Sequence, residues 1–271
     1  MPGERVRLTE EKATLLATLY ARALDSRAAA PILGDGFAAD AVDRLDVDFR
    51  TTKMTPSLAR QVAIRAKLID TWAAEFLAAN PEASVAHLGC GLDTRVHRMD
   101  PPAGVRWFDV DYPEVIDLRR RLLPERAGYT MIGSSVTEPE YLAEIPDDRP
   151  LLVIAEGLVY YLAEGAGPAL VKRLTGHAPS GEMIMDALSP LGVRLQRFNK
   201  PFQAAEATMH WGIDDPRELE ACHPGLRCVT AISAFRMPGR ELLTAPSRVT
   251  FRLFAHIPVF DRTARFLRYR W

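Results

Sequence analysis

The stretch SVAHLGCGLDTR, residues 84–95, decides the fold that this sequence predicts. A short apolar run ends in Gly89 and Gly91, and a second apolar run, VRWFDVD at residues 105–111, ends in carboxylates. Glycine lacks a Cβ and tolerates a positive φ, so the backbone here can approach a ligand closely. Asp111 lies 20 positions after Gly91 (111 − 91), close to the offset of about 20 residues expected of an acid that binds ribose hydroxyls. The pattern predicts a nucleoside site at the edge of a parallel sheet.

The glycine loop also indicates which nucleoside fits. A dinucleotide site has a third glycine, and its pyrophosphate lies on a helix N-terminus. Here the third glycine is missing, and Asp93 stands where a diphosphate would meet like charge. A carboxylate suits a ligand that carries an ammonium group and no phosphate, as S-adenosylmethionine does. The loop therefore favours this cofactor over a nicotinamide or a flavin, and a purely structural turn is the alternative.

Apolar runs alternate with helical patterns beyond Ser84. We predict strands at residues 84–88, 104–110, 128–132, 150–155 and 181–188, and crossover helices at Pro113–Leu123 and Glu164–Thr175. Alternating strands and helices are typical of a parallel sheet with right-handed crossovers. Residues 248–256 alternate between apolar and polar, and we predict an antiparallel terminal strand there. The fold class is α/β, with a Rossmann-like, doubly wound, mostly parallel sheet.

The first 80 residues read as helices. Thr9 is a plausible N-cap for a helix through Leu24, and a second helix is predicted from Ser57 to about Ala79. We expect residues 1–80 to form an N-terminal helical cap that contributes to substrate binding. Residues 81–271 then form the cofactor-binding domain, with a lid insertion after the fifth strand at about residues 189–215.

Composition excludes several functional classes. The 271 residues are 48% hydrophobic, enough to bury the core of one α/β domain with additions. A formal net charge of −1 gives no general attraction to nucleic acid or to an anionic membrane. No apolar stretch approaches the roughly 20 residues needed to span a bilayer, and residues 1–7 lack a signal-peptide core. The three cysteines fit reduced thiols in the cytoplasm, and Cys222, His223 and Cys228 are too few for a metal site.

Three ordered motifs carry a resemblance to a known family. They are LGCGLDTR at residues 88–95, WFDVDYPEV at 107–115 and VIAEGLVYYL at 153–162. Together they resemble the leucine carboxyl methyltransferase family, which includes the tetracenomycin-type polyketide O-methyltransferases. The resemblance covers roughly residues 50 to 190. It implies a class I methyltransferase fold that uses S-adenosylmethionine.

The resemblance also implies roles for individual residues. Asp111 matches the ribose-binding acid, Arg65 an arginine that holds the cofactor's carboxylate, and Glu156 an acid near the sulfonium or the methionine amine. Serine and valine stand where relatives have an aspartate and an apolar residue for adenine. The full set expected to bind the cofactor is Arg65, Gly89, Cys90, Gly91, Asp93, Arg95, Asp109, Val110, Asp111, Ser134, Ser135, Val136, Glu156 and Gly157.

Methyl transfer is an in-line displacement, in which alignment alone contributes on the order of 7–11 kcal/mol. A carboxylate acceptor is already ionised, whereas a phenol with a pKa of about 10 benefits from a base. No His/Asp pair with clear spacing identifies a base, which favours a carboxylate. Tyr160, Tyr161 and His210 are candidates to position the acceptor.

The sequence therefore predicts an O-methyltransferase that modifies a carboxyl or hydroxyl group of a small, polyketide-like metabolite and releases S-adenosylhomocysteine. Two alternatives stay open: a methyltransferase of protein C-terminal carboxylates, and a regulatory protein with a non-catalytic nucleoside pocket. The basic and aromatic tail at residues 265–271 is expected to pack on the domain or on a second subunit, so a homo-oligomer also stays open.

Overall fold

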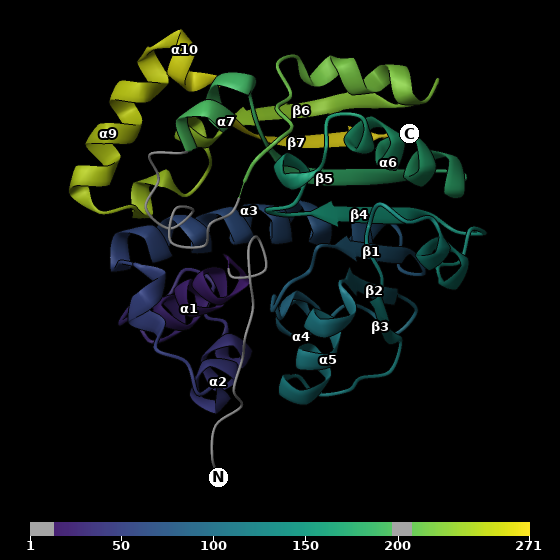
Figure 1. Ribbon diagram of the computed structural model, residues 1–271, viewed down its shortest axis with the longest axis horizontal. Coiled ribbons are helices and arrows are strands. Elements are labelled where there is room, and N and C mark those ends of the chain that lie inside the picture. The colour runs from purple at the N-terminus through teal and green to yellow at the C-terminus, as the bar shows by residue number, and fades with distance from the viewer. Residues whose placement is uncertain (1–13, 197–207) are drawn as a thin grey trace.

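A seven-stranded sheet with strand order β3-β2-β1-β4-β5-β7-β6 organises the molecule (Figure 1). The computed structural model describes residues 14–196 and 208–271. The strands are β1 (Ser84–Leu88), β2 (Arg106–Asp111), β3 (Tyr129–Gly133), β4 (Leu151–Ala155), β5 (Gly181–Leu188), β6 (Arg227–Ser233) and β7 (Ala264–Arg270). The first five pair in parallel, and β7 pairs antiparallel with both β5 and β6. The predicted parallel strands and the α/β class are confirmed.

Helices cover both faces of this sheet. Those described are α1 (Thr14–Ser26), α2 (Gly36–Arg44), α3 (Pro56–Ala79), α4 (Arg95–Met99), α5 (Pro113–Leu122), α6 (Ala166–His177), α7 (Pro190–Gln196), α9 (Ala245–His256) and α10 (Pro258–Asp261). Successive strand residues point to opposite faces, so Val85 packs with α3 while Ala86 and Leu88 pack with α6. Apolar residues of α1, α2 and α5 form a third cluster.

Helix α3 begins at Pro56, one residue before the predicted Ser57. Pro56 occupies the first turn, where a missing N–H costs nothing, and the Thr55 side chain accepts a hydrogen bond from the Leu58 amide at 3.2 Å. Asn80 follows the last residue of the helix. The predicted start of the first helix at Thr9 lies outside the described residues. So do residues 197–207 of the predicted lid insertion, whose first part is α7.

The predicted terminal strand at residues 248–256 is wrong, because this segment is helix α9. Pro246 lies in its first turn, and Phe251, Phe254 and Ala255 are its less exposed apolar side chains. Their spacing of three and four residues is helical. Over these few residues the apolar positions also match the two-residue period of a strand. The sequence of this segment alone therefore could not distinguish a helix from a strand.

The antiparallel strand next to β5 is instead the C-terminal segment β7. Its arginines are tolerated in the sheet because they are paired. Both Arg268 and Arg270 contact Glu182 of β5 through their guanidinium groups. The tail therefore packs within its own domain. Within residues 14–196 and 208–271, no helix has the length and apolarity to cross a membrane.

Candidate active site

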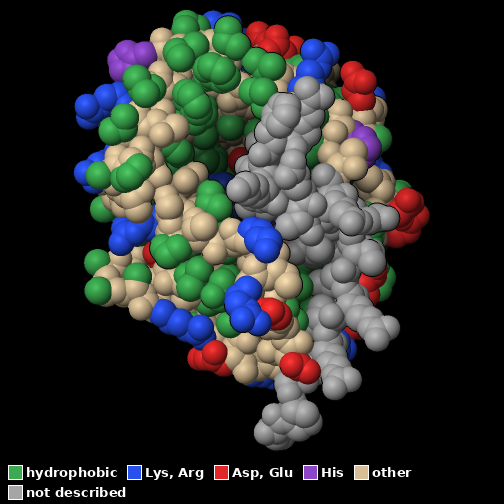
Figure 2. Space-filling model, turned by 60° about the vertical axis from the view of Figure 1, so that its left-hand side comes forward, with side chains coloured by type: hydrophobic (Ala, Val, Ile, Leu, Met, Phe, Trp, Pro, Cys, Tyr) green, Lys and Arg blue, Asp and Glu red, His purple; other side chains and the backbone are tan. Residues whose placement is uncertain are grey.

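A cavity of about 410 Å³ lies at the carboxyl ends of the parallel strands. Its walls come from the segments after β1 to β5, from α1 and α3, and from α9 and the start of β7. Figure 1 shows α1 and α9 at the end of the sheet toward which the arrow of β4 points. Figure 2 shows hydrophobic side chains around a hollow on this side of the molecule. The volume suits a small-molecule site, and its position is the one that open α/β sheets use for ligands.

The loop after β1 requires its glycines. Gly89 has φ of +58° and Gly91 has φ of +50°, a left-handed conformation that side chains disfavour. A Cβ on Gly89 would lie 2.9 Å from Leu158 Cδ1, and one on Gly91 would lie 3.2 Å from Leu15 Cβ. The Gly89 amide donates to the carbonyl of Val110 at 2.9 Å, which ties the loop to β2. Both glycines therefore present bare backbone to the cavity.

Asp111 lies at the end of β2, and the backbone fixes its carboxylate against this loop. Its Oδ2 accepts a hydrogen bond from the Gly91 amide at 2.7 Å, and its Oδ1 accepts one from the Tyr112 amide at 2.8 Å. Burial raises the pKa of Asp111 above its ordinary value, and the two amide donors oppose that rise. Each oxygen retains a lone pair that can accept a ligand hydroxyl.

A cluster of buried ion pairs lies at the ends of β1 and β4. Arg22 of α1 contacts Asp93 at 3.0 Å and Glu156 at 3.3 Å. Arg95 contacts both carboxylates, and Arg65 Nε lies 3.0 Å from Glu156. Burial acts to raise the pKa of Glu156, but the surrounding guanidinium groups outweigh it and lower that pKa to about 2. The guanidiniums likewise hold the pKa of Asp93 well below its usual range. Both carboxylates are therefore ionised.

Arg22 was not among the predicted site residues, although it lines the cavity and is 3% exposed. Its Nε is buried, with no hydrogen-bond partner in the described part of the chain. A buried donor without an acceptor is a cost to the fold. The signal was present in the sequence. Arg22 follows Leu15 and Leu19 at helical spacing on the apolar face of α1, where a charge needs a reason.

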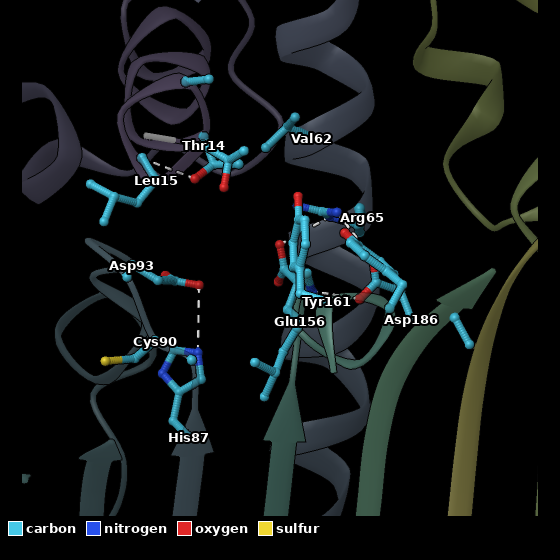
Figure 3. Close-up of a pocket in the computed structure, with 18 of the residues that line it drawn as sticks. Thr14, Leu15, Val62, Arg65, His87, Cys90, Asp93, Glu156, Tyr161 and Asp186 are labelled. Atoms are coloured by element: carbon cyan, nitrogen blue, oxygen red, sulfur yellow. Dashed lines mark hydrogen bonds and ion pairs between the residues drawn. The ribbon is translucent and has the colours of Figure 1, made fainter. Parts of the chain in front are cut away.

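Asp186, at the end of β5, is a second residue that the predictions missed. Its Oδ1 accepts a hydrogen bond from the Gly157 amide at 2.6 Å, and its Oδ2 accepts one from Arg65 Nη1 at 3.0 Å. Burial raises the pKa of Asp186, while the charge of Arg65 acts against the rise. Figure 3 shows Asp186, Arg65 and Tyr161 on the side of the cavity away from Asp93. A carboxylate at the end of a buried strand was its signal, as it was for Glu156.

Most of the predicted site residues meet at this cavity, both those expected to bind the cofactor and those expected to position the acceptor. Those that line it are Arg65, Gly89, Cys90, Gly91, Asp93, Asp111, Ser134, Ser135, Val136, Glu156, Gly157, Tyr160 and Tyr161. The hydroxyl of Ser135 contacts the Thr137 hydroxyl at 2.8 Å, and it does not cap a helix, because the next helical turn begins only at Glu140. No cluster that could hold a metal ion occurs among the residues described.

The structure does not bring the other four to the cavity. Val110 is a fully buried core residue, and Arg95 is a fully buried member of the ion-pair cluster that does not line the cavity. The His210 side chain is exposed, and only its backbone amide reaches the site region, where it donates to the Tyr160 carbonyl at 2.8 Å. The positions of these residues in the sequence predicted that they lie close to the cofactor. In the structure Val110 and Arg95 are buried in the protein, and the His210 side chain faces solvent.

Asp109, the fourth, supports the loop from beneath. Its carboxylate accepts hydrogen bonds from Trp107 Nε1 at 2.9 Å and from the Tyr129 hydroxyl at 2.6 Å, and it contacts His87 and Arg119. Arg119 in turn donates to the carbonyls of Gly91 and Asp93 at 2.7 and 2.8 Å. This network holds the loop in place, and its member His87 lines the cavity whereas Asp109 itself does not.

Comparison with known proteins agrees with this geometry. Residues 14–135 match the family model described as leucine carboxyl methyltransferase. The chain is 48% identical over 225 residues to the tetracenomycin polyketide synthesis O-methyltransferase TcmP of Streptomyces glaucescens, with 83% of each chain covered. It is 36% identical over 244 residues to the S-adenosyl-L-methionine-dependent methyltransferase dpfgK of Gibberella zeae, with 82% of each covered.

Solved structures share the fold at low sequence identity. A DUF574 family protein from Streptomyces avermitilis aligns with a TM-score of 0.57 at 16% identity, covering 93% of this chain and 96% of that one. The plantazolicin methyltransferase BamL aligns with a TM-score of 0.51 at 11% identity, covering 96% and 97%. With the two curated relatives, these observations show that the chain belongs to the leucine carboxyl methyltransferase family and is an S-adenosylmethionine-dependent methyltransferase.

Proposed function

We propose that this enzyme transfers the methyl group of S-adenosylmethionine to a carboxyl or hydroxyl oxygen of a small, apolar, polyketide-like acceptor, and releases S-adenosylhomocysteine. The observation that carries the proposal is the distribution of charge along one cavity. Asp111 lies beside the bare glycine loop at one end, and the paired Asp93 and Glu156 lie with Arg22 farther along. This order of charges matches the order of groups along S-adenosylmethionine: Asp111 for the ribose, the two carboxylates for the ammonium, and Arg22 for the cofactor's carboxylate.

The chain's own residues fit each part of that cofactor. Asp111 accepts from the ribose hydroxyls, and its two backbone donors fix its orientation. Asp93 and Glu156 stay ionised and supply negative charge for the ammonium and the sulfonium. Arg22 lines the cavity beside Asp93 and Glu156 and supplies a positive charge for the cofactor's carboxylate, and Arg65 also contacts Glu156. When bound, S-adenosylmethionine supplies an electrophilic methyl carbon.

Ser134, Ser135 and Val136 line the cavity beyond β3 and are the candidates to contact adenine. A hydroxyl can hydrogen-bond the exocyclic amine or a ring nitrogen. Val136 is an apolar side chain with 6% of its surface exposed, so it can pack against the base. These three residues thus extend the nucleoside end of the site past Asp111.

We place the acceptor on the opposite side of the cavity, and the strand order supports this. Passing from β2 through β1 and β4 to β5 leads from Asp111 past Glu156 to Asp186 and Tyr160. The remaining wall is mostly apolar, and includes Met54, Leu58, Val62, Leu158, Tyr161, Met237, Phe251 and Phe266. Such a wall suits a flat, apolar molecule. The name of TcmP, a polyketide O-methyltransferase, supports the same acceptor class.

Asp186 favours a hydroxyl acceptor. Its buried carboxylate would repel an ionised acceptor carboxyl, and its pKa is already raised, so it can accept the hydroxyl proton as the methyl group is transferred. In Asp186→Asn, turnover of a phenol should fall about 100-fold, the low end of the contribution of a general base. Methylation of a carboxylate should not fall. Equal losses on both acceptor types would contradict a base role for Asp186.

Calorimetric titration tests the cofactor directly. Purified enzyme should bind S-adenosylmethionine and S-adenosylhomocysteine saturably and should not bind NADH. NADH binding in their place would overturn the interpretation of Asp93. Methyl transfer from labelled cofactor to a panel of aromatic acids, phenols and a peptide with a free C-terminus then separates the acceptor classes. Transfer to the peptide alone would replace the small-molecule proposal.

Three broader proposals accompany this function. The cap at residues 1–80 contributes to substrate binding by the domain at 81–271, and the positions of α1 and α3 in the cavity wall support this. The enzyme acts in the cytoplasm on a dissolved small molecule, in keeping with its three free cysteines. The third proposal is that the enzyme does not bind nucleic acid, in keeping with its formal net charge of −1.

A further inference from the structure

A second cavity, of about 370 Å³, lies between residues 236–241 and helix α9. Arg236, Arg240, Arg248, Arg252 and His256 line it. We call this cavity the arginine groove. It does not belong to the cofactor site, but it adjoins the acceptor region because Phe251 lines both cavities.

The charges of the arginine groove are not balanced by the protein. Arg236 is paired with Asp261 at 3.0 Å. In residues 14–196 and 208–271, no carboxylate pairs with Arg240, Arg248 or Arg252, and Arg248 donates only to backbone carbonyls. Glu241 is the one carboxylate lining the groove in this part of the chain. Three unpaired guanidiniums against one carboxylate leave two positive charges.

Arg240, Arg248 and Arg252 are exposed, so an anion can reach this positive charge from solvent. Arg248 and Arg252 are four residues apart on α9, and like charges at that spacing destabilise a helix. The protein as a whole has a formal net charge of −1, so the concentration of cations here is local. His256, which also lines the groove, donates through Nδ1 to the Arg252 carbonyl at 2.7 Å. The groove thus presents guanidinium N–H groups that no anion in the described part of the chain binds.

We propose that the arginine groove binds a phosphate group. A phosphate monoester carries about −1.5 to −2 charges at pH 7, which matches the two uncompensated positive charges. Guanidinium groups bind phosphate oxygens through paired, charge-assisted hydrogen bonds. The phosphate is either free or carried by an apolar molecule that passes Phe251 into the acceptor region. The site stands on its own geometry and does not depend on the proposed methyl transfer.

Calorimetry with inorganic phosphate and with 1-naphthyl phosphate tests the site. The variant is Arg248→Gln with Arg252→Gln, because glutamine keeps the helix propensity and much of the side-chain stem. The matched control is Arg50→Gln with Arg120→Gln, which removes the same charge from exposed arginines elsewhere. Wild type and control should bind both probes saturably. The groove variant should bind them about 100-fold more weakly, since each charge-assisted contact contributes about tenfold or more.

Absence of saturable phosphate binding to the wild type overturns the proposal, as does an equal loss in the control. Naphthyl phosphate that binds at least tenfold more tightly than inorganic phosphate assigns the site to a phosphorylated apolar molecule, and equal affinities assign it to free phosphate. S-adenosylhomocysteine should bind all three proteins alike, which shows that they are folded. Phosphate binding by an enzyme that binds no adenosyl ligand would refute the proposed function and leave this site standing.

Discussion

Replacing Arg22 by methionine tests the most specific part of the cofactor site. Arg22 comes from α1, whereas its two partners, Asp93 and Glu156, follow β1 and β4. Methionine keeps the length and much of the apolar stem but removes the charged guanidinium group that lines the cavity. The change should therefore affect stability through the ion pairs, and cofactor affinity through the lost donor.

The structure sets the size of both effects. Removing one partner of a buried ion pair costs about 3–5 kcal/mol. Arg95 still contacts both Asp93 and Glu156 in the variant, so we expect the low end of that range. For a chain of this size, about 2–4 °C in Tm per kcal/mol corresponds to a fall of about 6–12 °C. Loss of a hydrogen bond to a charged group, worth about 1.5–3 kcal/mol, weakens cofactor binding about 10- to 100-fold.

The assay compares two ligands of the variant by calorimetry. S-adenosylhomocysteine has the amino-acid portion that Arg22 is proposed to hold, and 5′-methylthioadenosine lacks it. Arg22→Met should lose affinity for the first and keep its affinity for the second within about twofold. Arg27→Met, which removes a solvent-exposed arginine just beyond α1, is the matched control and should change neither. Equal losses for both ligands, or none for S-adenosylhomocysteine, would refute the reasoning.

The remaining predictions concern the loop and its acids. Gly91→Val should abolish S-adenosylhomocysteine binding, because φ is +50° and a Cβ would lie 3.2 Å from Leu15; normal calorimetric affinity would make the glycine merely structural. Asp111→Ala should weaken that binding by roughly 1.5–3 kcal/mol, and unchanged affinity in a folded variant would remove the ribose assignment. Glu156 has its pKa lowered from 4.5 to about 2, so its stabilising contribution is present above pH 4.5 and is lost as the pH falls toward 2. Glu156→Gln should therefore flatten the fall in Tm across that window, and an unaltered acid profile would contradict the shift.

Local patterns were sufficient for much of the fold. The boundaries of β1 and β5 agree with the predicted residues, because a buried parallel strand is a continuous apolar run with a sharp end. Helix α3 differs by one residue at its start, where Pro56 and the Thr55 cap mark it. The terminal strand, predicted at residues 248–256 but formed by β7, shows where local patterns stop being sufficient. Both segments mix arginines with apolar residues, and only pairing with β5 distinguishes the strand from the helix.

The sequence by itself determined the glycine loop, the acid at the end of β2 and the family, since these depend on residue types at short spacing. Only the tertiary structure decided which charges meet. Arg22 and Glu156 are 134 positions apart, and Arg65 and Asp186 are 121 apart, so neither pair has a local signature. Asp109 illustrates the reverse: its spacing matched a ligand-binding acid, but its neighbours His87, Trp107 and Tyr129 take up its carboxylate beneath the loop. The physical reason is that burial and ion pairing depend on distances in space, which the chain sets only when α1 and α3 pack over the ends of the strands.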